Sequence, residues 1–430
     1  GLWNSIKIIA LLYGILALLI AFPSYRKKKI FFLLWPVVVI LGIMVLENPP
    51  IVKLENGEKV LDYWQSSDGV VSIVQLPENI EMRLDNFYVL GDSKSFLVEQ
   101  MQAHVPLMIH PAPKKVVFLG MGTGVTAGAA LNHEVEKVIA VELVSNVIPA
   151  AKRYFSPWTN GLFKDKRANI VADDARNFLL GTNEQFDVIV GDLFTPWHAG
   201  TGSLYTLEHF EQAKKRLSPG GIFAQWLPLY QLTSENFNTI AATFAAVYPQ
   251  VTLWRADFST TRASILLVGQ EEDTQLDENI LRQNIVHVIG EQVVQENNHM
   301  AGLFYLGNLE AIRNRLSGVE LNTDDRRSVE FRAPILSQQA NSGRASYITG
   351  KELDTLLTAL RSNLPAEEDP YLSNLPMDEI RFVKVGSLYH RYIQYVSAGK
   401  EDKAKKIREQ IQLLASDFLK TETKAIDEVN

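Results

Sequence analysis

The expected fold is decided by residues 114–142, KKVVFLGMGTGVTAGAALNHEVEKVIAVE. The apolar run 116–119 predicts a buried parallel strand, because such strands are covered on both faces and do not alternate with polar residues. A glycine turn, an Ala-rich segment compatible with a helix and a second apolar run, 138–141, follow it. The second run ends on Glu142. This order of strand, turn, helix and strand predicts a nucleotide-binding βαβ unit.

The turn is Gly120-Met121-Gly122-Thr123-Gly124, and it predicts a site for a nucleoside-containing ligand. Glycines let the backbone approach a ligand closely, and the helix that follows offers unpaired N–H groups. A carboxylate at the end of the next strand, here Glu142, can accept hydrogen bonds from ribose hydroxyls. The register lacks G-x-G-x-x-G, so NAD is disfavoured and a ligand of the S-adenosylmethionine type is favoured. The alternative is a glycine turn that only allows the helix to pack closely on the strand.

The composition is that of an ordinary folded protein and excludes several kinds of site. Of the 430 residues, 47% are hydrophobic, which is enough for one large core or two smaller ones. A net charge of −7 argues against nucleic acid as a partner, because a phosphate-binding surface is basic. A chain without cysteine has no disulfide, thiolate metal site or cysteine nucleophile, and no metal site is predicted.

Residues 1–50 predict a membrane anchor of two transmembrane helices. Two apolar runs of about seventeen residues, 6–22 and 30–46, are each near the lower limit for crossing a bilayer. The basic turn between them, 24–29, is placed in the cytoplasm by the positive-inside rule. The large part of the chain would then lie outside, whereas an adenosyl cofactor is supplied inside. The sequence leaves the side of the membrane open.

Three further regions follow the predicted anchor. Alternating apolar residues and turn residues predict a small antiparallel β subdomain over 51–97. Repeated strand and helix patterns over 98–335 predict a Rossmann-like α/β domain, with a mostly parallel sheet and helices on both faces. Residues 336–430 predict a linker and amphipathic helices, of which the last two form a helical hairpin.

Acidic residues follow three of the predicted parallel strands, namely Glu142, Asp174 and Asp192. The carboxyl ends of parallel strands meet at one edge of a sheet, and ligands bind there. We therefore expect the three carboxylates to gather around the glycine loop. For Asp174 alone, a helix cap is an equal alternative.

These residues resemble the spermidine synthase family, specifically its membrane-attached branch, which is often fused to transporter-like helices. The resemblance covers about residues 63–334. It is carried by HPAPKKV leading into GMGTG (110–124), VADDARNFL (171–179), FDVIVGD (186–192), LYT (204–206), SPGG (218–221), QWLP (225–228) and NTDD through EF (322–331). It implies an S-adenosylmethionine-dependent, Rossmann-like transferase fold in which 322–334 forms the closing strand.

The resemblance also implies aminopropyl transfer, in which an amine attacks a methylene beside the sulfonium of decarboxylated S-adenosylmethionine. Asp192 matches the residue that orients and deprotonates the amine in that family. The cofactor-binding residues would be Gly120, Gly122, Thr123 and Gly124 in the loop, Glu142 on the ribose, and Asp174 with Ala175 on the adenine. Spermidine synthases are commonly dimers or tetramers, so a homo-oligomer is expected, or a subunit of a larger assembly joined through the C-terminal helices.

Three departures from the family pattern fall around the expected site, one beside the amino group of the co-substrate and two on the acceptor side. Thr123 and Thr195 stand where the family has Asp, and Val98-Glu99-Gln100 stands where it has Tyr-x-Glu. Fewer carboxylates predict weak binding of ordinary putrescine, because a buried ammonium needs a paired carboxylate. Glu99, Gln100 and Thr195 are then the expected substrate-binding residues, with Glu99 as a partial substitute. The missing Asp at position 123 also removes a repulsion that would exclude intact S-adenosylmethionine.

The predicted function is a membrane-anchored, spermidine synthase-like transferase that uses S-adenosylmethionine or its decarboxylated form to alkylate an amine. Phe194, Pro196 and Trp197 favour an apolar or aromatic acceptor, with a packed lid over the loop as the alternative reading. A second hypothesis is a scaffold or interaction subunit that keeps the fold without the chemistry. A third is a sensor that binds a polyamine or a nucleoside without turnover.

Overall fold

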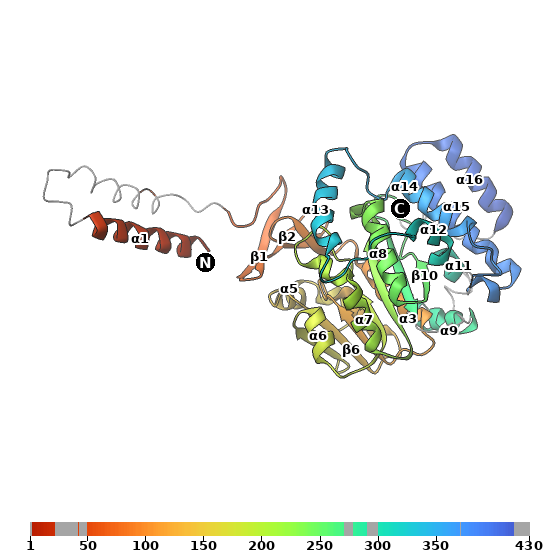
Figure 1. Cartoon of the computed structure of the whole chain (residues 1–430), viewed down its shortest axis with the longest axis horizontal. Coiled ribbons are helices and arrows are strands. Elements are labelled where there is room, and N and C mark those ends of the chain that lie inside the picture. Colours follow the sequence, from red (N-terminus) through yellow and green to blue (C-terminus); the bar gives the residue numbers. More distant parts are fainter. Residues whose placement is uncertain are drawn as a thin grey trace. The chain divides into compact units, whose positions relative to one another are not determined.

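The computed structural model describes residues 2–21, 42, 50–270, 278–289, 300–369 and 371–416 (Figure 1). The chain divides into two compact units, Gly1–Asp92 and Ser93–Asn430. The first unit contains helix α1 (Leu2–Ala21) and a four-stranded sheet. The second unit contains the α/β domain, the candidate functional site and the C-terminal helices.

The sheet of the first unit is antiparallel, with strand order β1-β2-β3-β4. Its strands are β1 (Lys59–Ser66), β2 (Gly69–Gln75), β3 (Ile80–Leu84) and β4 (Tyr88–Asp92). Asp85 and Asn86 turn the chain between β3 and β4 with positive φ angles of 53° and 65°, which Asp and Asn tolerate better than most residues. The predicted antiparallel β subdomain is confirmed.

The predicted membrane anchor finds no support in this structure. Within the described residues, no helix meets the length and apolarity that a membrane span requires. The expected first span, 6–22, falls largely on α1. The expected second span, 30–46, lies outside the described residues apart from residue 42.

The second unit is built on an eight-stranded sheet with the order β12-β10-β11-β9-β8-β5-β6-β7. Its strands are β5 (Lys115–Leu119), β6 (Lys137–Glu142), β7 (Ala168–Ala172), β8 (Phe186–Gly191), β9 (Leu217–Pro228), β10 (Gln250–Trp254), β11 (Ser264–Gln270) and β12 (Tyr305–Asn308). Strands β9, β8, β5, β6 and β7 are parallel, and the other three pair antiparallel. The predicted mostly parallel sheet is confirmed.

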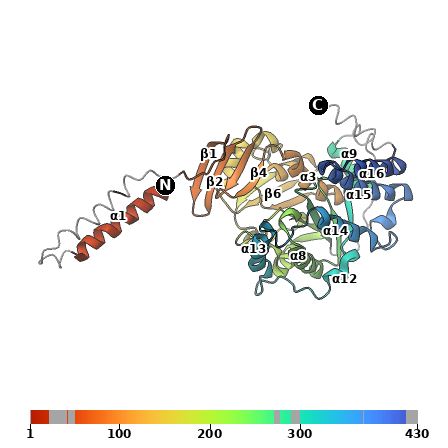
Figure 2. The ribbon, with the colours of Figure 1, turned by 90° about the horizontal axis from the view of Figure 1, so that it is seen from above.

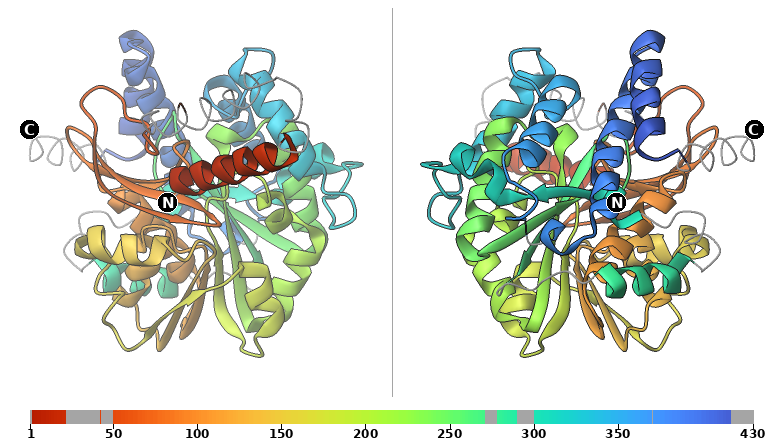
Figure 3. Two further views of the ribbon diagram at one scale, coloured as in Figure 1. Left: turned by 90° about the vertical axis from the view of Figure 1, so that its left-hand side faces the viewer. Right: turned by 90° about the vertical axis from the view of Figure 1, so that its right-hand side faces the viewer.

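Helices cover both faces of this sheet, with α8 on one face and α9 on the other (Figure 3). The helices of the α/β part are α3 (Phe96–Ile109), α4 (Val125–Ala129), α5 (Val147–Tyr154), α6 (Ala175–Gly181), α7 (Leu207–Lys215), α8 (Ser234–Val247), α9 (Glu278–Ile289), α11 (Met300–Phe304) and α12 (Arg313–Leu316). Phe223 of β9 stacks on Phe244 of α8 with a centroid distance of 5.7 Å. Such aromatic contacts bury the apolar sides of β9 and α8 against each other.

Gly128 in α4 is a position where the fold requires glycine. A Cβ there would lie 2.1 Å from the backbone carbonyl oxygen of Thr159, and a backbone atom cannot move aside cheaply. We expect Gly128→Ala to lower the free energy of unfolding by about 3 kcal/mol, at the upper end of the cost of overpacking. Chemical denaturation measures it. Gly181→Ala is the matched control, because a Cβ at this exposed helix end meets no atom within 4 Å, and equal stability losses in both variants would contradict the packing argument.

The C-terminal part is helical, with α13 (Ser328–Asn341), α14 (Gly350–Ser362), α15 (Met377–Ser397) and α16 (Glu401–Leu414). Helices α15 and α16 lie side by side and form the predicted hairpin (Figure 2). Two predictions here are wrong. The closing strand expected over 322–334 is a loop followed by α13, while β12 forms that edge of the sheet. The linker expected to begin near residue 336 starts inside the same helix.

Candidate functional site

The carboxyl ends of four neighbouring parallel strands form one edge of the large sheet. Leu119 at the end of β5 pairs with Val141 of β6 and with Gly191 of β8, and Glu142 pairs with Ala172 at the end of β7. The glycine loop, Glu142, Asp174 and Asp192 therefore all begin within two residues of this edge. The structure brings together the residues that the sequence placed at the strand ends.

The glycine loop has a backbone conformation that favours glycine at each of its three glycine positions. Gly120, Gly122 and Gly124 have φ angles of 100°, 52° and 79°, in the left-handed region. A Cβ at Gly120 would also lie 3.2 Å from Cβ of Asp192 and 3.4 Å from Cε1 of Phe194. Gly120 and Gly122 remain partly exposed. The loop thus packs closely against the Asp192 segment and keeps part of its backbone accessible.

Glu142 is buried and fastens the glycine loop with its carboxylate. Oε2 accepts hydrogen bonds from the backbone N–H groups of Gly122 (3.0 Å) and Met121 (3.3 Å), and Oε1 accepts one from Val144 (2.9 Å). Burial raises the pKa of Glu142 despite these bonds, and the charge of Asp192 adds to the rise. A carboxylate has about four acceptor positions. Three are used here, so Glu142 has room for one ribose hydroxyl rather than two.

Asp192 lies directly after β8, beside the glycine loop. Its Oδ1 accepts a hydrogen bond from the backbone N–H of Leu193 at 2.7 Å. Burial raises the pKa of this carboxyl group to about 6, and the bond from Leu193 only partly opposes the rise. The side-chain amide of buried Gln225, on β9, donates to the backbone carbonyl of Asp192 at 3.1 Å. Asp192 is therefore a carboxylate held by hydrogen bonds on its side chain and its backbone, and a pKa raised to about 6 suits a general base.

The raised pKa of Asp192 predicts a pH-dependent difference in stability between the protein and Asp192→Asn. In the unfolded chain the pKa returns to about 3.9, so ionisation between about pH 4 and pH 6 favours unfolding. We expect Asp192→Asn to be more stable at pH 8 by on the order of 3 kcal/mol, with the difference vanishing near pH 4. Thermal unfolding at several pH values measures it. A stability difference of the same size at every pH would show that it does not come from the raised pKa of Asp192. The same pH pattern in Asp173→Asn, which changes an exposed neighbour, would also contradict the prediction.

The aromatic residues after Asp192 are packed into the protein. The ring of Phe194 contacts Tyr205 edge-on at a centroid distance of 6.2 Å, and the Tyr205 hydroxyl donates to the Phe194 carbonyl at 2.7 Å. Trp197 packs against the main hydrophobic core. Thr195 is buried, and its carbonyl accepts a hydrogen bond from Thr201. These contacts match the packed-lid alternative for the aromatic residues.

Helix α3 supplies a carboxylate to the glycine loop. The hydroxyl of Thr123 donates a short hydrogen bond to Oε2 of Glu99, and Thr123 itself is buried. Gln100 donates to the carbonyl of Trp158 at 3.5 Å, so its amide is directed to that neighbouring segment. Glu99, the residue expected to compensate in part for the missing acids, thus contacts the loop, whereas Gln100 does not.

Asp174 acts as the N-cap of α6. Its Oδ1 accepts hydrogen bonds from the backbone N–H groups of Arg176 (2.8 Å) and Asn177 (3.0 Å), which satisfies the first turn of the helix. Ala175 is the first residue of that helix. The cap alternative is thus the contact that the structure shows for Asp174, and both residues remain partly exposed beside Glu142.

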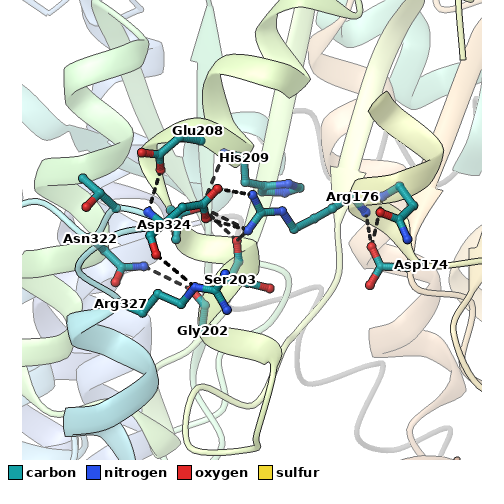
Figure 4. A network of polar contacts seen from close by, with 12 residues as sticks. Asp174, Arg176, Gly202, Ser203, Glu208, His209, Asn322, Asp324 and Arg327 are labelled. Atoms are coloured by element: carbon teal, nitrogen blue, oxygen red, sulfur yellow. Dashed lines mark hydrogen bonds and ion pairs between the residues drawn. The ribbon is translucent and has the colours of Figure 1, made fainter. Parts of the chain in front are cut away.

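A network of polar contacts fixes the segment that follows the Asp192 loop (Figure 4). Arg176 forms a two-pronged ion pair with Asp324, at 2.8 and 2.6 Å, and also donates to the carbonyl of Ser203. Glu330 accepts hydrogen bonds from the backbone N–H groups of Gly200 and Gly202. The loop 322–327 and the start of α13 thereby hold the 3₁₀ helix Thr201–Tyr205 in place.

Several of these residues were missed from the sequence. Gln225, Arg176 and Glu330 were not singled out. The QWLP and DDAR stretches contain Gln225 and Arg176, but a side chain that acts on backbone far along the chain leaves no local pattern. Only the three-dimensional contacts identify these positioning residues.

Comparisons with known proteins place this site in a family. A family model described as "Spermine/spermidine synthase domain" matches residues 95–263. The polyamine aminopropyltransferase of Saccharolobus solfataricus is 31% identical over 210 residues, which cover 44% of this chain and 69% of that protein. The chain belongs to the spermidine synthase family. The family of aminopropyltransferases is thus shown, and no finding supports its membrane-attached branch.

Other spermidine synthase family members match with similar coverage. The polyamine aminopropyltransferase of Aeropyrum pernix is 31% identical over 208 residues, covering 46% of this chain and 66% of that protein. The one from Escherichia coli O1:K1 / APEC is 35% identical over 143 residues, 33% of this chain and 49% of that protein. The chain thus spans about half to two thirds of these relatives. The crystal structure of spermidine synthase from Thermotoga maritima matches with a TM-score of 0.44 and 23% identity, covering 63% of this chain and 84% of that one.

The family match covers the glycine loop, Glu99, Glu142, Asp174 and Asp192, and it ends before Asp324, Glu330 and the C-terminal helices. It begins at the residue before α3, which carries Glu99, and ends just before β11. Helices α13 to α16 and strand β12 lie beyond it. The family model therefore assigns no function to the C-terminal helices.

Proposed function

We propose that this protein transfers an aminopropyl group from decarboxylated S-adenosylmethionine to an amine, with Asp192 as the general base. The observation that carries the proposal is the position of Asp192, partly buried beside the glycine loop with a pKa raised to about 6. The residues present fit an adenosine: a partly exposed glycine loop, Glu142 with one free acceptor position, and the first turn of α6. When bound, the co-substrate supplies a sulfonium leaving group.

The reaction requires a neutral amine. Asp192 takes a proton from the acceptor ammonium, and the nitrogen lone pair then attacks the methylene carbon next to sulfur. The carbon–sulfur bond breaks, its electron pair goes to sulfur, and methylthioadenosine leaves. A base with a pKa of about 6 is ionised at pH 7 and above, so it is ready to accept this proton.

Glu99 supports the decarboxylated form as the preferred co-substrate. Its carboxylate accepts a hydrogen bond from the Thr123 hydroxyl. Negative charge is therefore present at the glycine loop even though the side chain at position 123 is neutral. A carboxylate there attracts the free ammonium of the decarboxylated compound and repels the carboxylate of intact S-adenosylmethionine. This revises the expectation, drawn from position 123 alone, that the intact compound would be tolerated.

Removing the charge of Glu99 should weaken the preference for decarboxylated over intact S-adenosylmethionine. Glu99→Gln can still accept the hydrogen bond from Thr123 but carries no charge. We expect KM for the decarboxylated compound to rise about tenfold, since losing one charge-assisted contact costs about 1.4 kcal/mol. Steady-state kinetics measure it, with Glu136→Gln, an exposed residue before β6, as the control. An unchanged preference between the two compounds would show that Glu99 does not select the co-substrate.

The direct test of the proposed function is a turnover assay. The full chain is incubated with decarboxylated S-adenosylmethionine and, in turn, with putrescine, spermidine, longer diamines and aromatic amines, and methylthioadenosine is quantified. We expect methylthioadenosine to form with at least one amine and to be absent with Asp192→Asn. If none of the amines yields methylthioadenosine although decarboxylated S-adenosylmethionine still binds, the transferase proposal is refuted and a sensor or scaffold is favoured.

We further propose, from the apolar runs 6–22 and 30–46 in the sequence, that the full chain is attached to a membrane. Fractionation and protease accessibility in intact cells test attachment and side together. Recovery of the chain in the supernatant after high-speed centrifugation would contradict it. The proposed reaction does not depend on the outcome.

A further inference from the structure

Strand β12 and the C-terminal helices α14 and α15 line a cavity that contains none of the residues of the glycine loop. It has a volume of about 410 Å³ and lies between β12, α14 and α15. Leu306, Leu360, Val383 and Leu388 form apolar parts of its wall. A volume of this size is within the range that holds small organic ligands. All of these residues lie beyond residue 263, where the family match ends.

Three cationic side chains, Arg361, Lys384 and Arg391, also line this cavity. Nη1 of Arg361 is buried without a hydrogen-bond partner. Asp354 attracts Arg361 and Arg391 electrostatically, but within the part of the chain that the structure describes no hydrogen bond or close ion pair joins it to either of them. Burying a guanidinium with an unsatisfied N–H group costs folding free energy. Its presence therefore indicates a ligand that accepts a hydrogen bond from it.

A fourth cation, Arg255, contacts α15 at Gly386. Arg255 is 3% exposed, and its Nη1 donates to the carbonyl of Gly386 at 3.4 Å. Its Nε and Nη2 are buried without partners. The charge of Arg361 adds to the burial that lowers the pKa of Arg255 to about 9, which shows that the two cations repel each other. Positive charge is therefore concentrated around this cavity.

The nearby carboxylates are occupied by other groups. Asp369 accepts hydrogen bonds from the hydroxyl of Tyr305 at 2.7 and 2.9 Å and from two backbone N–H groups. Asp257 accepts the backbone N–H of Ser259, and burial raises its pKa. Burial raises the pKa of Asp354 as well, and the charges of Arg391 and Arg361 and a hydrogen bond with Gln394 partly oppose the rise. Asp354 offsets part of the positive charge of Arg361 and Arg391, and Asp257 offsets part of that of Arg255. An anionic ligand would neutralise the charge that remains.

We propose that this cavity binds an organic phosphate, with Arg361, Arg391 and Lys384 around the phosphate group and the apolar wall against the rest of the ligand. Arginine matches phosphate geometry through two parallel N–H donors, and lysine adds a further positive charge. Three cations fit a dianionic phosphate better than a single carboxylate. The site is separate from the proposed transferase site, and either can exist without the other.

The test is isothermal titration of the full chain with phenyl phosphate, inorganic phosphate and benzyl alcohol at constant ionic strength. We expect saturable binding of phenyl phosphate, weaker binding of inorganic phosphate, and none of benzyl alcohol. The double variant R361Q/R391Q should bind phenyl phosphate at least about tenfold more weakly. R408Q, which removes an exposed Arg of α16, should bind as the unmodified protein does.

Two results would overturn the proposal. One is the absence of saturable phenyl phosphate binding to the unmodified chain. The other is equal binding by R361Q/R391Q and R408Q. If the double variant does not fold, as judged by its circular dichroism spectrum, K384Q takes its place with an expected loss of several-fold in affinity. Because the phosphate probes contain no nucleoside, their binding does not depend on the glycine loop.

Discussion

Asp192→Asn is expected to lower kcat/KM for aminopropyl transfer by about 10²- to 10⁴-fold, the usual contribution of a general base. Asparagine has nearly the same shape and can still accept the hydrogen bond from Leu193, so the loop should keep its position. The variant loses only the ability to take a proton from the acceptor amine. Asp173→Asn, an exposed neighbour of the same site, serves as the matched control.

The pH profile distinguishes a base from a residue that only holds the loop. With Asp192 present, kcat/KM should rise with pH through about 6, because the carboxyl group must ionise before it can accept a proton. In Asp192→Asn this limb should disappear. A variant that keeps the limb, or that loses less than about tenfold in rate, would show that another group deprotonates the amine.

Glu142→Gln is expected to weaken binding of methylthioadenosine by at least about tenfold, because each misplaced hydrogen bond at a buried site costs about 1–3 kcal/mol. The carboxylate now accepts three backbone N–H bonds through both oxygens. A glutamine amide has one acceptor oxygen, so its NH₂ group must face a backbone N–H on one side. The glycine loop should lose its fixed conformation together with the ribose contact.

Titration calorimetry with methylthioadenosine measures this loss of affinity. Glu136→Gln is the control, because it makes the same change at an exposed residue directly before β6, the strand that ends on Glu142. The circular dichroism spectrum of Glu142→Gln should stay that of the unmodified protein, because the effect is local. Unchanged affinity would mean that neither the ribose nor the loop depends on Glu142.

The central part of the fold could be predicted because its signals are local. The run 116–119, the three glycines and the acids after successive strands occur within a few residues of one another, and parallel pairing brings the strand ends to one edge. The glycine turn in particular needs left-handed φ angles that few other residues adopt. The family resemblance added roles for these residues that spacing alone does not supply.

The region 322–341 shows where the sequence misleads. Apolar residues at alternate positions, such as Val329 and Phe331, are compatible with a strand. The buried residues are instead Val329, Ala333 and Ser337, four residues apart on one face of α13. Pro334 inside the helix and the exposed apolar side chains of Phe331 and Ile335 concealed the period. Phe331 points to solvent, with 72% of its surface exposed.

The contacts that position the site could not be predicted for a different reason. The ion pair of Arg176 with Asp324 joins residues 148 positions apart, and Glu99 reaches Thr123 from a helix of its own. Such contacts depend on how the elements pack in three dimensions. Position 123 read alone suggested a loss of negative charge, whereas the packing of α3 restores it.

The most direct test of the account is a titration of the full chain with decarboxylated S-adenosylmethionine, intact S-adenosylmethionine and methylthioadenosine. The account predicts saturable one-to-one binding of the decarboxylated compound and of methylthioadenosine, with weaker binding of the intact compound. Saturable binding should weaken in Glu142→Gln and persist in Asp192→Asn, which separates binding from catalysis. If none of the three compounds binds, the edge of the sheet around the glycine loop is not an adenosyl site, and the proposed transferase function is wrong.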